Sequence, residues 1–150
     1  MRRRLAAFWA VAGLIPSLML GLAACGDPDQ QMLSEGARAA REAVSGVRTA
    51  QLAAQSLLDG KLWSQPATVM VTDAEDALGQ VATTFDARQP ETDESRRTYD
   101  QYSEALANAA AGVTELRIAL RRGDLETVRK QVGQLDKTAE QLEQLGERAQ

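Results

Sequence analysis

The chain has 150 residues, with 17 Lys and Arg against 21 Asp and Glu, a formal net charge of −4. It contains no histidine, which removes the commonest general base and zinc ligand, and its one cysteine excludes an internal disulfide. The acidic balance disfavours nucleic acid and anionic lipid head groups as partners, because their phosphates repel it.

The first 25 residues have the parts of an export signal. Three arginines follow Met1, the stretch from Leu5 to Leu22 carries no charge, and small residues occupy positions 23 and 24. At about 18 residues this stretch is also long enough to cross a bilayer, so an uncleaved anchor helix is the alternative. Gly13 and Pro16 weaken a continuous helix and favour a cleaved signal.

The end of this leader, Leu22-Ala23-Ala24-Cys25, resembles the lipobox of bacterial lipoproteins. The resemblance covers residues 1–25 only. It implies cleavage between Ala24 and Cys25 and attachment of a diacylglycerol to the Cys25 thiol. Two acyl chains hold a protein durably at a membrane, so the implied location is the extracytoplasmic face of the cell membrane.

The resemblance divides the chain into a signal peptide (1–24), a lipidated cysteine with its tether (25–30) and a domain (31–150). The chain that remains after cleavage has 14 Lys and Arg against 21 Asp and Glu, because three arginines lie in the leader. With Cys25 lipidated, this part has no free thiol, and its stability must come from packing. Its length is sufficient for one domain with its own core.

The periodicity of apolar residues predicts four amphipathic helices in the domain. Asp27-Pro28 is a favourable start for the first, and Asp59-Gly60 ends it. The second helix has two possible starts, Pro66 or, later, Thr72 as a capping residue, and it stops at Gln89-Pro90. We favour the earlier start because Met70 continues the apolar series.

The third helix is predicted to start at Thr92 or Asp93 and to end at Arg122-Gly123, and the fourth runs from Asp124 close to Gln150. So short a joint between them makes the two antiparallel. The predicted buried seams are Leu33, Ala37, Ala40, Val44, Val47, Ala54 and Leu58; Met70, Ala74, Leu78, Val81 and Phe85; Tyr99, Tyr102, Leu106, Ala109, Val113, Leu116 and Leu120; and Leu125, Val128, Val132, Leu135, Ala139 and Leu142.

No strand pattern competes with these helices. The predicted fold is therefore all-α, an up-down-up-down antiparallel four-helix bundle after a cleaved signal peptide. We expect Trp63 to fold back over the end of the bundle, with a binding role as the alternative, and the hydroxyls of Tyr99 and Tyr102 to reach a wet edge of the core.

Charged residues gather at four places, and we interpret all four as helix capping and solvated faces. The sharper alternative is a weak divalent-cation site formed by the two acidic helix starts, which an antiparallel bundle holds at opposite ends. We expect no metal ion and no cofactor. The four groups are Asp73, Glu75 and Asp76; Glu91, Asp93 and Glu94; Asp136, Glu140, Glu143 and Glu147; and Arg117, Arg121 and Arg122.

No catalytic motif occurs in the sequence: it has no phosphate-binding glycine loop and no G-x-S-x-G. The sequence therefore predicts a non-enzymatic, lipid-anchored helical bundle that acts as an interaction or spacer module in the cell envelope. Its expected partners are the membrane, through Cys25, and an envelope protein, without a nucleic acid or an identified small-molecule substrate. The alternative is an envelope lipoprotein that binds a solute or a divalent metal.

Overall fold

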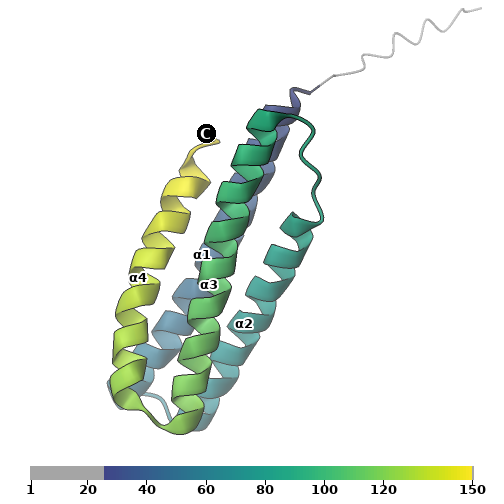
Figure 1. Cartoon of the computed structure of the whole chain (residues 1–150). Helices are drawn as coiled ribbons and strands as arrows, with labels where there is room; N and C mark the ends of the chain where they lie inside the picture. Colours follow the sequence, from purple (N-terminus) through teal and green to yellow (C-terminus); the bar gives the residue numbers. More distant parts are fainter. Residues whose placement is uncertain (1–25, 150) are drawn as a thin grey trace, which may run out of the picture.

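The computed structural model describes residues 26–149 as four helices that pack against one another. They are α1 (Pro28–Leu58), α2 (Ser64–Asp86), α3 (Asp93–Arg122) and α4 (Leu125–Glu147). The described part of the chain contains no strand, so the predicted all-α class is confirmed. The α1–α2 and α3–α4 connections lie at one end of the molecule, and the α2–α3 connection lies at the other, near the start of α1 (Figure 1).

The helix boundaries follow from local capping chemistry. The Asp27 side chain accepts a hydrogen bond from the Asp29 amide at 3.0 Å, and Pro28 occupies the first turn of α1. Thr92 and Ser95 cap α3 reciprocally. Gly123 ends α3 in the left-handed conformation, at φ 67°, which glycine adopts without strain.

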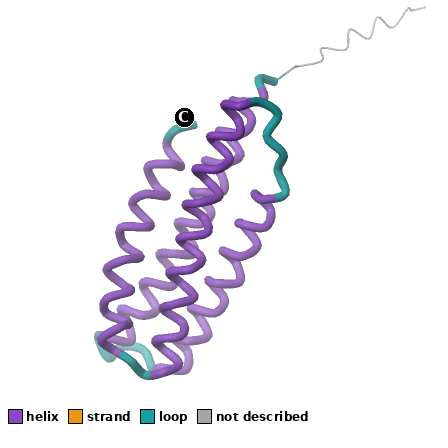
Figure 2. The backbone as a smooth tube through the Cα atoms, viewed as in Figure 1, coloured by secondary structure: helices purple, strands orange, loops and turns teal. Residues whose placement is uncertain are grey.

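Two helix ends differ from the sequence prediction, and both belong to α2. The start of α1 at Pro28, capped by Asp27, is the predicted one, so residues 28–30 are already helical. The second helix begins at Ser64, earlier than either predicted start, with an extended Trp63 at its cap position. It ends at Asp86, so α2 and α3 are joined by the longest connection in the described chain, visible in Figure 2.

The arrangement of the helices is that of a flattened bundle. Helix α1 packs against α2, α3 and α4, and α3 also packs against all the others, whereas α2 and α4 do not meet within the described residues. Helices α1 and α3 therefore form the centre, and α2 and α4 lie on opposite sides of them.

Small residues on α1 and larger residues on α3 and α4 fill the core. Gly36 of α1 lies directly under the ring of Tyr102, whose side chain is fully buried. The Tyr102 hydroxyl donates to the Leu145 carbonyl oxygen at 2.8 Å, near the end of α4. The α1 face consists mostly of alanine, and the opposing helices supply Leu106, Val113, Leu116, Leu120, Val128, Leu135 and Leu142.

Most of the predicted seam residues are buried; five are half-buried, and only Met70 and Leu125 are exposed. Met70 is 38% exposed, because Val71 holds the inward position four residues after Ala67. Leu125, in the first turn of α4, is 48% exposed. The prediction for Trp63 is wrong: its side chain is 84% exposed, since the short connection carries it away from the core.

Candidate functional site

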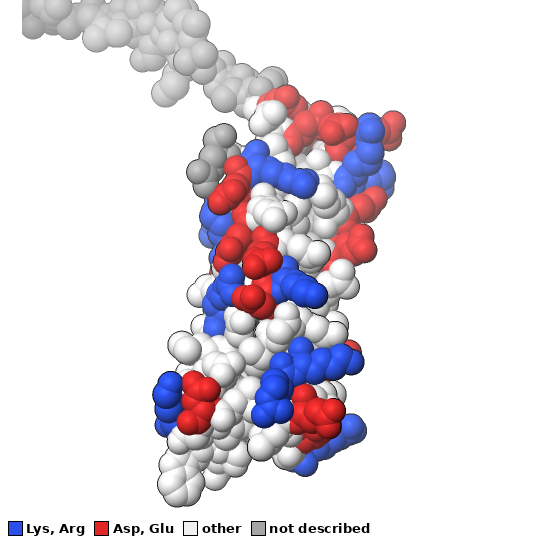
Figure 3. Space-filling model, turned by 90° about the vertical axis from the view of Figure 1, so that its left-hand side faces the viewer, with Lys and Arg blue, Asp and Glu red and all other residues white. Residues whose placement is uncertain are grey.

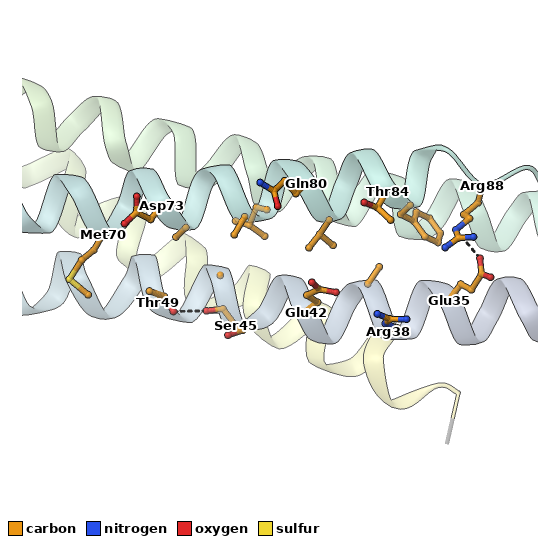
Figure 4. A pocket seen from close by; sticks show the side chains of 17 residues that line it. Glu35, Arg38, Glu42, Ser45, Thr49, Met70, Asp73, Gln80, Thr84 and Arg88 are labelled. Carbon is orange, nitrogen blue, oxygen red and sulfur yellow. Dashed lines mark hydrogen bonds and ion pairs between the residues drawn. The ribbon is translucent and has the colours of Figure 1, made fainter.

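An open groove lies between α1 and α2, with a volume of about 790 Å³. Figure 4 shows side chains from both helices along it, with Arg38 and Glu42 on α1 and Asp73 and Gln80 on α2. Its floor is apolar and includes Ala39, Gly46, Ala74, Leu78, Val81 and Phe85.

Small residues on both helices leave this groove open. Gly46 of α1 has no side chain, and a Cβ placed there would lie 3.0 Å from Leu78 Cγ, so the two helices meet closely at this level. Ala39, Ala74 and Ala77 line the rest without filling it. Within residues 26–149, no third helix covers the outer side of the groove, because α4 lies on the far side of the bundle.

An ion pair closes one end of the groove. Arg88, just beyond α2, lies 3.2 Å from a Glu35 carboxylate oxygen on α1. The same two residues line a smaller pocket of about 290 Å³ under the α2–α3 connection. Met70 lines the other end.

The polar groups of the groove wall do not converge on one point. The Thr49 hydroxyl donates to the Ser45 carbonyl oxygen at 2.8 Å, within α1. Glu42 and Asp73 come from opposite walls at different levels in Figure 4. Among residues 26–149, no three His, Cys, Asp or Glu side chains gather as a metal ion would require.

The acidic group at positions 73–76 is divided between two environments. Asp73 lines the groove, whereas Glu75 points toward α3 and pairs with Arg117. Thr114 also donates to Glu75, at 2.6 Å. Burial opposes the ionisation of Glu75, but the hydrogen bonds from Arg117 and Thr114 outweigh it and lower the pKa of this carboxyl. Glu75 therefore joins α2 to α3, and the capping interpretation is wrong for it.

The arginine group divides in the same way. Arg117 belongs to this ion pair rather than to the end of α3, so its expected role at the helix terminus is not its main one. Its neighbour Glu75 raises the pKa of the guanidinium through their hydrogen bond. Arg121 and Arg122 lie in the last turn of α3, where cations stabilise the helix end.

The acidic stripe of α4 is a solvated face that also contacts α1. Arg48 of α1 donates to Asp136 at 2.6 Å and to Glu143 at 3.0 Å. The hydrogen bonds from Arg48 and Gln51 lower the pKa of Asp136. Asp136 and Glu143 still face solvent, with side chains 49% and 46% exposed, so the predicted solvated face is present but their pairing with Arg48 was not predicted. Glu140 and Glu147 are exposed.

Sequence reasoning missed Arg48 because it is one of three arginines on α1 and belongs to no motif. The signal lies in its neighbours: it follows the buried Val47 directly, and it precedes Gln51, the polar residue that interrupts the predicted seam. A cation and an amide one turn apart at the edge of a seam indicate a polar contact with the next helix.

The remaining candidates are structural. Asp93 and Glu94 lie in the first turn of α3, as the capping interpretation predicts, and Glu91 lines the small pocket before it. Tyr99 donates to the Asp86 carbonyl oxygen at 3.2 Å. The prediction of a wet edge is wrong for Tyr102, because its hydroxyl is buried against α4 and burial raises its pKa.

The lipobox, with Ala24 and Cys25, lies outside the described residues. Within those residues, no helix is both long and apolar enough to span a membrane. Comparison with known proteins gives no relative: no family model, curated protein or solved structure matches the chain.

Proposed function

We propose that the protein is a lipid-anchored, extracytoplasmic and non-enzymatic lipoprotein that acts as an interaction or spacer module of the cell envelope. The observation that carries the proposal is the sequence Leu22-Ala23-Ala24-Cys25 at the end of a leader with a basic start and an uncharged stretch from Leu5 to Leu22. The mature domain would be an up-down-up-down bundle, because its three connections alternate between two ends (Figure 1).

The start of α1 supports this proposal. Only Gly26 and Asp27 separate Cys25 from Pro28, the first residue of the helix. Two residues reach at most about 7 Å when extended, so the bundle of a protein lipidated at Cys25 begins close to the membrane surface. Helix α1 is 31 residues long, and it would carry the far end of the bundle about 45 Å from its start.

The experiment compares the wild-type chain with Cys25→Ser in a bacterial host fed labelled fatty acid. We expect the wild type to carry the label and to enter the detergent phase, and the variant to do neither. Ser17→Ala, which leaves the four lipobox residues unchanged, serves as the matched control and should behave as the wild type. A cleaved Cys25→Ser protein that still carries the label would overturn the proposal.

The groove between α1 and α2 favours a second candidate function, the binding of an elongated solute. Its volume is within the range of small-molecule sites, and its apolar floor has polar walls. Ala77 is an exposed residue of the groove wall, so Ala77→Trp would fill the groove without replacing a core residue. A solute that raises the melting temperature of the wild type but not of Ala77→Trp would support this function, and an equal rise in both would reject the groove as its site.

A further inference from the structure

The large exposed apolar side chains gather at one end of the described molecule. All six lie within residues 52–70 and 115–132, which form the end opposite the start of α1 and which we call the distal end (Figure 1). Each of the four helices contributes at least one of them, and the α1–α2 connection contributes another. They are Leu52 (64% exposed), Trp63 (84%), Val69 (54%), Met70 (38%), Ile118 (37%) and Leu125 (48%).

These side chains form a collar around the end of the bundle rather than a stripe along one side. Leu52 and Met70 are six residues from the distal ends of their helices, about 9 Å along the axis at ~1.5 Å per residue. Interfacial segments bury their apolar side chains to a depth of roughly 5–10 Å below the head groups. The collar therefore has the depth of a bilayer interface.

The charge of the distal end is opposite to that of the rest of the molecule. Together with Glu75, which pairs with Arg117, residues 52–70 and 115–132 carry six Lys and Arg against five Asp and Glu, whereas the rest of residues 26–150 carries eight against 16. Figure 3 shows acidic side chains crowded near the start of α1, with basic ones among them, and separate basic and acidic clusters just above an uncharged tip at the opposite end. The exposed cations of the distal end are Lys61, Arg121, Arg122, Arg129 and Lys130.

We propose that the distal end docks on the surface of an anionic phospholipid bilayer. Cations attract the phosphates, and their long aliphatic stems let the apolar collar enter the interface beside them. Trp63, on a connection next to Lys61, is the type of side chain that occupies the head-group level. The acidic remainder is repelled by the same surface, so the bundle meets the bilayer end-on.

A bilayer fits this surface better than a single protein partner does. The collar faces outward from every helix of a convex end, and a fluid lipid surface can surround such an end, whereas a partner protein would cover one side. The net negative charge of the whole chain disfavours anionic lipids, but it is an average that includes a distal end with more cations than anions. The inference rests on the proposed function, in which the protein is a spacer anchored at Cys25. Docking of the distal end would give that spacer a second membrane contact about 45 Å from its anchor.

The test uses residues 26–150, which contain every side chain of the hydrophobic core but not Cys25. Trp63 is the only tryptophan in this chain, because Trp9 lies in the leader, so its fluorescence reports on the distal end alone. The chain is added to vesicles of phosphatidylglycerol with phosphatidylcholine, or of phosphatidylcholine alone. We expect a blue shift of Trp63 emission and co-sedimentation with the anionic vesicles, both declining as salt is raised.

Two matched double variants locate the contact. Arg121→Glu/Arg122→Glu reverses two adjacent charges at the distal end of α3, and Arg96→Glu/Arg97→Glu reverses two at the opposite end of the same helix. We expect the first to bind anionic vesicles at least about tenfold more weakly and the second to keep its binding. Circular dichroism establishes that both are folded before they are compared.

Absence of co-sedimentation and of a Trp63 shift with anionic vesicles would overturn the proposal. Equal losses in both double variants would also overturn it, because binding would then follow net charge rather than the distal end. If the chain does not bind vesicles and a protein crosslinks to its distal end, that protein, and not a bilayer, is the partner of this surface. None of these results depends on Cys25, so failure here is distinguishable from failure of lipid attachment.

Discussion

At the scale of single residues, the contact between Gly36 and Tyr102 shows how this alanine-rich core is filled. A Cβ added to Gly36 would lie 2.6 Å from Tyr102 Cδ2, well inside van der Waals contact. The ring cannot withdraw easily, because its hydroxyl is bonded to the Leu145 carbonyl oxygen. One glycine therefore allows α3 to place its largest core residue between α1 and α4.

We predict that Gly36→Ala lowers the free energy of unfolding by about 1–3 kcal/mol, since the new methyl group must displace the ring. Gly133→Ala is the matched control: Gly133 is in α4 with no atom within 4 Å of an added Cβ, so alanine should stabilise its helix by about 0.5–1 kcal/mol. Urea denaturation measures both changes. Two equal effects would show that Tyr102 does not pack on Gly36.

The Glu75–Arg117 ion pair predicts a pH dependence of stability. The pKa of Glu75 is lower in the folded protein than its ordinary value of 4.5. The unfolded chain therefore binds more protons as the pH falls, so the stabilisation is complete above about pH 5 and is lost at lower pH. Glu75→Gln should make the decline of the melting temperature between about pH 5 and 3 shallower.

Removing the partner of Glu75 provides a second arm of this experiment. Arg117→Gln takes away the donor that lowers the Glu75 pKa, so it should flatten the same acid limb. If both variants kept the wild-type slope, the ion pair would not contribute to the acid sensitivity of the fold.

At the scale of elements, the helices were largely predictable and their polar contacts were not. Apolar residues at steps of three and four predict the inward faces of α1 and α3 from the sequence alone, because that spacing is a property of one helix. The Arg48 contacts with Asp136 and Glu143 join residues about 90 positions apart. Such pairs depend on how the helices are rotated and staggered, which periodicity does not determine.

The candidate site was less predictable than the fold. The groove arises where two runs of small residues meet, and neither run differs in sequence from an ordinary alanine-rich seam. The inward-facing residue at the start of α2 was predicted as Met70, and that prediction is wrong for a related reason. Methionine and valine are adjacent there, and only the packing of Ala67 and Ala74 decides that Val71 turns inward.

We predict that hydrogen exchange is slowest in α1 and α3. These two helices pack against three neighbours each, whereas α2 and α4 pack against two and α2 also borders the open groove. Amides of the more peripheral helices should open more often by local unfolding. Exchange measured by mass spectrometry on the folded chain tests this order, and slower exchange in α2 than in α1 would contradict the arrangement of the bundle.

At the scale of the whole molecule, the two ends of the bundle differ in chemistry. The end where α1 begins is acidic and lies two residues from Cys25, and the distal end carries the exposed apolar collar and an excess of cations. The net charge of residues 25–150, −7 from 14 Lys and Arg against 21 Asp and Glu, is an average over two ends of different charge. Such an end-to-end difference suits a protein that is held at one end and makes its contacts at the other.

The proposed function therefore depends most on how the chain is held. The measurement that tests this directly is the mass of the N-terminal peptide of the protein extracted from cell envelopes. We predict a peptide that begins at Cys25 and carries the mass of a diacylglycerol on its sulfur. A peptide that still contains residues 1–24, or one that begins at an unmodified Cys25, would contradict the lipid-anchored account.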